Sequence, residues 1–384
     1  MRLTMQIAKP FRSVAGLRKV QVAAVALSAA LLLGCAKSDA PPSTGVLPAP
    51  TAATQLTSDL TIGDGDILFA RVGGITVDEN GRIYVSDAGQ ESAIHIFEAS
   101  GEYVGELGAQ GEGPGEYRWP GDIFVDPDSI TVFDSYYNSR LIYDRDGTPR
   151  RKLERFTAPK ERHSLRAIGR TRDGSGYWIT QNQSVSTGMT EADIADQSIH
   201  VITNDGVVGP QLATAPEYEM LLASTANSIT MRTAPFGRQT YFVVVGDTLY
   251  KAWSADVRLE GFTVQGDSLE PIEIAYDPIP VTDADRDEAI EDASDQFRSK
   301  LVFPENRPAI MGVTSDDEGN VWIKIRLSLD ENETTYWIVD PRERTVRAVT
   351  MDGNVRVMAV RDGSAYATFT TEEGEPLVVR YPLR

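Results

Sequence analysis

The chain has 384 residues, and its 37 Lys and Arg against 56 Asp and Glu give a formal net charge of −19 at pH 7. A surface this acidic repels nucleic-acid backbones and anionic lipid headgroups, which excludes general nucleic-acid binding and charge-driven attachment to a membrane. Cys35 is the only cysteine, so the fold has no internal disulfide and depends on a packed core.

The first 34 residues have the order of an export signal. Five Lys and Arg residues precede an apolar stretch, Val20–Leu33, and Gly34 and Cys35 follow it. The stretch has 14 residues, whereas a membrane span needs roughly 20. The segment resembles a bacterial lipoprotein signal peptide with its lipobox at residues 32–35, which implies cleavage before Cys35 and lipidation of that cysteine. An ordinary signal peptide or a short membrane helix with a chance cysteine is the alternative.

Residues 35–54 are predicted to form a disordered tether. The segment is small, polar and proline-rich, so it buries too little apolar surface to fold. Loss of the leader leaves 32 basic against 56 acidic residues, a net charge of −24, so membrane contact must come from the lipid. Ala36 and Lys37 follow Cys35, which resembles the signal for outer-membrane rather than inner-membrane lipoproteins.

A strand–turn–strand phrase begins at Gly74–Asp87, where two alternating apolar strands flank Asn80-Gly81. Asn-Gly favours positive φ at both central positions of a tight hairpin. Ile94–Phe97 and Tyr103–Leu107 supply a third and a fourth strand. The phrase returns 48 residues later, from Asp122 onwards.

Fainter copies of the phrase follow, with turns at Asp173-Gly174, Gly246-Asp247, Glu318–Asn320 and Asp362-Gly363. Four antiparallel strands per unit at a period of 40 to 50 residues predict propeller blades, which cover one another's faces around an axis. We count six units, so we predict an all-β, six-bladed β-propeller of four-stranded antiparallel blades over residues 55–384. Leu56–Ile62 is the expected fourth strand of the last blade, and this pairing closes the ring.

One helical insertion is predicted near residues 282–302, within the segment 282–307. Acidic residues crowd its start, and Arg298 and Lys300 lie near its end, as the helix dipole favours. The alternative is a calcium loop over Asp283–Asp287. That loop requires Gly at its sixth position, where this chain has Glu288.

The repeated pattern resembles the bacterial six-bladed β-propellers of the NHL-repeat type, many of which are predicted lipoproteins. The motifs that carry the resemblance are the strand–turn–strand phrase, Asp87 and Asp134 at the ends of second strands, Asn138–Arg140, and the glycine-rich segment Gly111–Tyr117. Because Asp87 and Asp134 repeat from blade to blade, we expect them to bond backbone amides of the following loops. Such propellers include both binding proteins and enzymes, so the fold leaves the function open.

Histidines do not form an obvious catalytic set. His95 and His200 occupy matching third-strand positions and are expected to lie away from the channel, while His163 falls in a loop. A three-histidine zinc site needs convergent side chains, so no catalytic residue, metal or cofactor is predicted. The glycine-rich segment Gly111–Gly115 lacks the helix and Lys-Ser/Thr of a phosphate loop, and we interpret it as a blade-to-blade connection.

The candidate ligand-binding residues are basic and aromatic, and they fall in or beside the loops expected on one face: Arg71, Arg118, Trp119, Arg140, Arg238 and Arg307, with Arg162 beside them. Guanidinium groups gathered at one mouth would attract an anionic group. The alternative is that each arginine pairs with a local acidic neighbour.

These patterns favour a lipid-anchored monomer of the cell envelope whose propeller is a rigid binding scaffold for a protein, peptide or glycan. The alternative is a metal-dependent lyase or lactonase-like hydrolase with its site in the central channel.

Overall fold

The computed structural model describes residues 45–384, except residues 66, 90, 138, 154–162, 184–189, 191–195, 225–227 and 330–331. The predicted leader, Cys35 and Arg162 therefore lie outside the described residues. Within the described ranges, none of the helices has the length and apolar character needed to cross a membrane.

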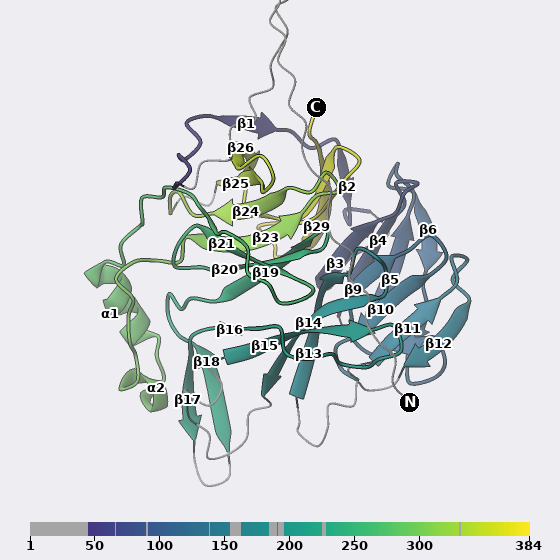
Figure 1. Ribbon diagram of the computed structural model, residues 1–384, viewed down its shortest axis with the longest axis horizontal. Helices are drawn as coiled ribbons and strands as arrows, with labels where there is room; N and C mark the ends of the chain where they lie inside the picture. Colours follow the sequence, from purple (N-terminus) through teal and green to yellow (C-terminus); the bar gives the residue numbers. More distant parts are fainter. Residues whose placement is uncertain are drawn as a thin grey trace, which may run out of the picture. The chain divides into compact units, whose positions relative to one another are not determined.

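Six four-stranded antiparallel sheets form a ring of blades (Figure 1), as the repeat predicts. From the axis outwards, the strands of blades 1 to 3 are β3 (Val72–Val77), β4 (Ile83–Asp87), β5 (Ala93–Phe97), β6 (Tyr103–Glu106); β9 (Pro120–Val125), β10 (Ile130–Asp134), β11 (Ser139–Tyr143), β12 (Pro149–Leu153); and β13 (His163–Arg170), β14 (Gly176–Gln183), β15 (Asp196–Thr203), β16 (Ala213–Pro216). Those of blades 4 to 6 are β19 (Thr240–Val245), β20 (Thr248–Trp253), β21 (Arg258–Thr263), β22 (Ile272–Glu273); β23 (Ile310–Ser315), β24 (Val321–Ile325), β25 (Glu333–Asp340), β26 (Thr345–Asp352); and β27 (Val355–Arg361), β28 (Ser364–Thr370), β29 (Pro376–Pro382), β2 (Leu60–Ile62).

The last blade is completed by the start of the folded body. β2 pairs antiparallel with β29, with Leu60 opposite Arg380 and Ile62 opposite Val378. Arg380 also holds Asp59 through two contacts, Nε–Oδ1 at 2.8 Å and a second guanidinium nitrogen to Oδ2 at 3.0 Å. The closure is therefore as predicted, although the closing strand is shorter than residues 56–62.

The segment ahead of β2 is also part of the folded body, so the predicted tether extends too far. Leu47 is buried, and its backbone pairs with Ile274 at the outer edge of blade 4. β1 (Ala53–Leu56) then adds a fifth, parallel strand to blade 5 beside β26. Leu47 and Leu56 fill apolar sites that the proline-rich composition did not reveal, which is why residues 45–54 do not behave as a linker.

Two insertions interrupt the repeat. α1 (Asp283–Glu291) has Thr282 as its N-cap, which forms a reciprocal capping box with Asp285, and α2 (Asp295–Arg298) follows. These helices confirm the predicted insertion, and the alternative of a calcium loop is wrong. The hairpin of β17 (Met220–Ser224) and β18 (Ile229–Thr233), which α2 contacts (Figure 1), was not predicted.

The glycine-rich connection between blades 1 and 2 contains a short parallel pair, β7 (Ala109–Gln110) and β8 (Glu116–Tyr117). Tyr117 is fully buried, and its hydroxyl accepts from the Ile94 amide and donates to the Leu107 carbonyl. Burial raises the pKa of Tyr117, so this hydroxyl stays protonated and holds the connection against blade 1. Gly111 has φ near 158°, and a Cβ there would collide with the Glu116 side chain.

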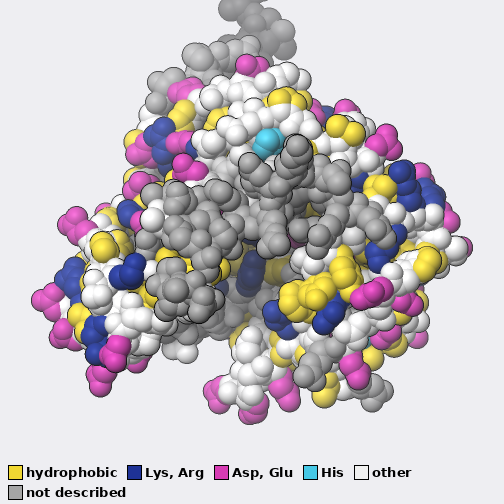
Figure 2. Space-filling model, turned by 90° about the horizontal axis from the view of Figure 1, so that it is seen from below, with side chains coloured by type: hydrophobic (Ala, Val, Ile, Leu, Met, Phe, Trp, Pro, Cys, Tyr) yellow, Lys and Arg dark blue, Asp and Glu magenta, His cyan; other side chains and the backbone are white. Residues whose placement is uncertain are grey.

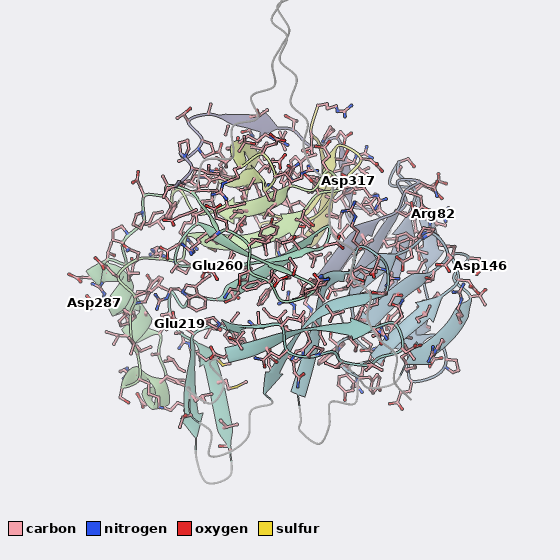
Figure 3. All side chains as sticks on the ribbon, in the orientation of Figure 1. Arg82, Asp146, Glu219, Glu260, Asp287 and Asp317 are labelled. Carbon is pink, nitrogen blue, oxygen red and sulfur yellow. The ribbon has the colours of Figure 1, made fainter. Side chains whose placement is uncertain are left out.

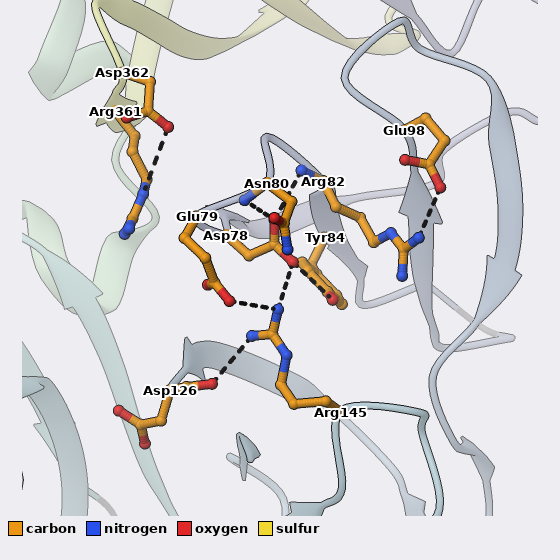
Figure 4. Close-up of polar contacts among 10 residues, drawn as sticks. All are labelled: Asp78, Glu79, Asn80, Arg82, Tyr84, Glu98, Asp126, Arg145, Arg361 and Asp362. Carbon is orange, nitrogen blue, oxygen red and sulfur yellow. Dashed lines mark hydrogen bonds and ion pairs between the residues drawn. The ribbon is translucent and has the colours of Figure 1, made fainter. Parts of the chain in front are cut away.

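On the face that carries the first-to-second strand turns, Arg145 joins blades 1 and 2 (Figure 4). One guanidinium nitrogen lies 2.7 Å from Asp78 Oδ2, and another donates to the Asp126 carbonyl at 3.0 Å. Asp78 is 2% exposed, and its other oxygen accepts from the Asn80 and Arg82 amides. A buried carboxylate needs such partners, so Arg145 stabilises the interface between these blades.

Candidate functional site

The second-to-third strand loops and the blade-to-blade connections emerge on one side of the ring, which we call the loop face. Figure 2 shows this face with a hollow in its middle, Lys or Arg atoms inside the hollow, and hydrophobic side chains beside other Lys and Arg residues. Of the predicted ligand residues, Arg71, Arg118 and Trp119 are exposed in these connections. The hollow and the exposed connections offer two separate places for a ligand.

Asp134, at the end of β10, organises the loop face of blade 2. Its carboxylate is 1% exposed. One oxygen accepts from the Arg118 amide at 2.9 Å, and the other accepts from the Trp119 amide at 3.2 Å and the Tyr136 amide at 3.0 Å. The carboxylate therefore binds the loop that follows β10, as predicted, and also ties it to the connection before β9.

The side chains held in this way form a group that we call the aromatic platform: Arg118, Trp119, Tyr136 and Tyr137. Trp119 and Tyr136 are 45% and 43% exposed, and their rings meet edge to face with centroids 5.1 Å apart. The Arg118 guanidinium lies 4.1 Å from the Tyr136 centroid. The Tyr137 ring meets the Tyr136 ring edge to face with centroids 4.8 Å apart, and its hydroxyl donates to Glu112.

Blade 1 shares the bonds to the preceding connection but lacks the aromatic side chains, and the expected bond from Asp87 to the loop that follows it is not among the described contacts. Asp87 accepts from the Ala70 and Arg71 amides at 2.8 and 2.7 Å, and the Arg71 carbonyl accepts from Ala88. The Trp119 carbonyl makes the equivalent bond to the amide after Asp134, so Arg71 occupies the position of Trp119. The fold is thus built equally well without exposed rings, and the platform is not required for folding.

Arg140 is not at the mouth, and this prediction is wrong. Its side chain is 1% exposed, one guanidinium nitrogen donates to the Thr203 and Asn204 carbonyls, and its guanidinium carbon lies 5.3 Å from the Tyr177 ring centroid. It lies between blades 2 and 3, so its charge serves packing instead of binding.

Arg238 and Arg307 follow the alternative of local pairing. Two guanidinium nitrogens of Arg238 donate to Oε1 of Glu219, which is labelled in Figure 3, and the Arg238 amide donates to Oε2. The side-chain hydrogen bond raises the pKa of Arg238. Arg307 pairs with Asp285 of α1 at 2.5 Å and lies 4.6 Å from the Phe236 ring centroid. Both cations are engaged within the fold.

The hollow leads to a cavity of about 1630 Å³ along the axis. The inner strands of blades 2 to 6 line it. Near the loop face its charged and polar lining comprises Asp122, Arg166, Gln239, Tyr241 and Arg356. None of these residues was predicted as a ligand contact.

The channel side chains carry both signs of charge. The Asp122 side chain is exposed to the channel, and desolvation by the surrounding inner strands raises its pKa while Arg166 and Arg356 oppose the shift. Burial also raises the pKa of Tyr241, against a hydrogen bond from Gln239 and the field of the arginines. The hydroxyl is therefore a neutral donor and acceptor at neutral pH.

The position of the channel residues within each repeat could have identified them from the sequence. Asp122, Arg166 and Arg356 each directly precede a buried residue of an inner strand, and Gly74 has the equivalent place in blade 1. Aligning the blades on their buried residues would have placed these side chains at one level of the channel. The predicted ligand set was drawn from the loops alone, so it does not contain these inner-strand residues.

The histidines lie away from the cavity lining where they are described. His95 packs among the Phe69, Phe97 and Tyr103 rings, and burial lowers its pKa. His200 contacts the Gly209 carbonyl and Ser198. The positions expected for these two residues are confirmed. Among the described residues, no three His, Cys, Asp or Glu side chains are placed to share a metal ion.

Comparison with known proteins agrees with the fold. A family model described as a 6-bladed beta-propeller matches residues 64–157, which hold blades 1 and 2. No curated protein matches the chain. A solved structure from Bacteroides fragilis, of a protein provisionally assigned as exported, is similar at 14% identity and TM-score 0.52, over 88% of this chain and 99% of that one.

Two more distant similarities have TM-scores of 0.44 and do not bear on function. One is regucalcin, a calcium-binding protein from Agrobacterium tumefaciens, at 11% identity over 87% of this chain and 98% of that chain. The other is the PQQ-bound aldose sugar dehydrogenase from Streptomyces coelicolor, at 15% identity over 87% and 99%. The NHL-type repeat and the lipid anchor stay predictions.

Proposed function

We propose that this six-bladed β-propeller is a lipid-anchored binding protein of the bacterial cell envelope, and that its aromatic platform contacts a partner protein. Trp, Tyr and Arg are the residues that contribute most to protein–protein interfaces. Here all three lie together on two connections that one buried carboxylate fixes. This fixed order lowers the entropy lost on binding.

The observation that supports the proposal is the difference between blades 1 and 2. The same backbone bonds carry Ala70 and Arg71 in blade 1 but Arg118 and Trp119 in blade 2, where Asp134 also holds the Tyr136 amide. Exposed apolar rings cost solubility without adding to the fold, so a binding role accounts for them.

Charge indicates the partner's chemistry. The platform places Arg118 and the nearby Lys152, whose ammonium lies 5.4 Å from the Tyr137 ring centroid, on a protein that is acidic overall. An acidic partner would be repelled from most of the surface and attracted here. The positive charges of the platform would therefore direct an acidic partner to this face and fix the orientation in which it docks.

Cross-linking of the full chain in envelope preparations identifies the partner, and binding is then measured with both proteins purified. Trp119→Ala should weaken binding roughly 30-fold, which corresponds to about 2 kcal/mol for a central interface residue. Arg71→Ala is the matched control in blade 1 and should change the Kd less than about twofold. Equal affinity of the wild type and a Trp119→Ala/Tyr136→Ala variant would exclude the platform as the binding surface.

The anchor has its own test. Mass spectrometry of the mature protein should find an N-terminal Cys35 that carries glyceride-linked and amide-linked acyl chains, and Cys35→Ala should release the chain from the outer membrane fraction. A free thiol at position 35, or cleavage elsewhere, would contradict the lipoprotein prediction while leaving the platform untouched.

A further inference from the structure

The axial cavity contains a set of charges that the aromatic platform does not use. Asp122 comes from blade 2, Arg166 from blade 3 and Arg356 from blade 6, and all three line the same cavity. Blade 1 lies between blades 6 and 2, and Gly74 leaves its equivalent position without a side chain. A Cβ there would lie only 3.3 Å from the Gly121 carbonyl.

These opposite charges face one cavity without touching. No hydrogen bond and no ion pair within 4.0 Å joins Asp122 to either arginine, and within the described ranges neither guanidinium makes a side-chain hydrogen bond. On the same inner strand as Arg166, by contrast, Arg170 closes on Asp126 at 2.8 Å. An ion pair thus forms between these two strands further along the channel. The separation of Asp122 from Arg166 and Arg356 occurs only at the level near the loop face.

The neighbouring charged groups are already engaged. Glu217 accepts from Asn182 at 2.5 Å, and Arg326 donates to the Pro308 carbonyl at 3.3 Å. The charged groups that make no side-chain hydrogen bond are therefore the two guanidinium groups of Arg166 and Arg356 and the carboxylate of Asp122. The Tyr241 hydroxyl lies on the same cavity, and the field of Arg166 also reaches Glu217.

We propose that the axial cavity binds a small amino acid ligand that carries two carboxylates and one ammonium group. Each carboxylate would accept a guanidinium fork, from Arg166 and Arg356, and the ammonium would donate to Asp122. Guanidinium forks match carboxylates in geometry, and three complementary pairs leave no charge in the set without a partner.

The choice of ligand follows from the charge count. A simple anion would leave Asp122 unpaired and repelled, and a simple cation would meet two guanidinium groups. A neutral zwitterion with one carboxylate would satisfy only one arginine. A dicarboxylic amino acid is the smallest common molecule that matches the set one for one.

The test is isothermal titration calorimetry of the full chain, purified in detergent at low ionic strength, with L-glutamate as the probe. Glutarate has the same two carboxylates and lacks the ammonium group. Wild-type protein should bind L-glutamate saturably and glutarate at least tenfold more weakly. Asp122→Asn should weaken L-glutamate at least tenfold and remove the preference over glutarate.

Arg166→Gln and Arg356→Gln should each weaken both compounds at least tenfold. Arg170→Gln removes an arginine that is already paired, so it should leave binding unchanged, and melting temperatures verify that every variant folds. No saturable heat with L-glutamate, equal binding of glutarate, or an Asp122→Asn variant that binds like wild type would each overturn the proposal. Trp119→Ala should bind L-glutamate normally, so failure of this site and failure of the platform are distinguishable.

Discussion

Asp134 and Asp87 are equivalent carboxylates with different roles in our proposal, and substituting each by Asn separates stability from binding. Asp134 accepts three backbone hydrogen bonds, and Asp87 accepts two. In each, both carboxylate oxygens are used. Asn keeps the shape but turns one oxygen into an NH2 group that faces an amide donor.

The magnitude follows from the bonds lost. A hydrogen bond to a charged group is worth about 1.5–3 kcal/mol, and a neutral one is worth about 1 kcal/mol. Asp134→Asn loses one charged bond and weakens two, which sums to about 4 kcal/mol. Asp87→Asn loses one and weakens one, which sums to about 3 kcal/mol. Urea unfolding followed by circular dichroism measures both.

The two variants should differ far more in binding. Asp134→Asn releases the connection that holds Arg118 and Trp119, so partner affinity should fall by at least tenfold. Asp87→Asn should leave it unchanged, since Arg71 is not part of the platform. A stability loss below about 1 kcal/mol for Asp134→Asn would refute the bonding argument. Similar binding by both variants would refute the role of Asp134 in positioning the platform.

Three further predictions concern stability. Asp122→Asn should melt at a higher temperature than wild type at pH 7, because desolvation in the channel raises the pKa of Asp122 and its ionised form destabilises the fold. This difference in melting temperature should shrink as the pH falls towards about 4 and the wild-type carboxyl is protonated. A difference that does not change with pH would contradict this. Arg145→Ala leaves the buried Asp78 without its ion-pair partner and should cost about 2–3 kcal/mol in urea unfolding, whereas Arg82→Ala, which removes a half-exposed pair, should cost less than about 1 kcal/mol. Deletion of residues 46–62 removes three buried apolar side chains and the closing strand, so the melting temperature should fall by roughly 10 °C or more; an unchanged melt would show that the ring does not depend on this closure.

The sequence predicted the blades because each one repeats a local pattern. The turn expected at Gly246-Asp247 lies between β19 and β20, which end and begin directly on either side of it. Alternating apolar residues and a turn dipeptide determine such hairpins with little help from the rest of the chain. β1 differs, because it pairs in parallel with β26 almost 300 residues away. No local pattern encodes that contact.

The candidate site was harder to predict because residue type does not reveal whether a side chain is buried between blades or exposed on the surface. Arg140 and Arg118 are both arginines beside a blade loop, yet one is buried between blades and the other lies on an exposed ring. The difference comes from the neighbouring blade, which offers carbonyl partners to Arg140 and, among the residues that the structure describes, none to the Arg118 side chain. Charge in a loop is therefore weak evidence for a ligand site until the contacts between blades are known.

A repeat protein also contains its own controls. Where equivalent positions in several blades carry the same residue type, as Asp87 and Asp134 do, the shared backbone contacts explain it. Where they diverge, as Gly74, Asp122, Arg166 and Arg356 do, the fold accepts any of these residues and so does not explain the choice. Divergence that places unpaired charges of both signs around one cavity lowers stability without helping the fold. We expect this loss of stability to be retained where the charges bind a ligand. The unpaired charges are therefore the strongest reason to propose a ligand in the axial cavity.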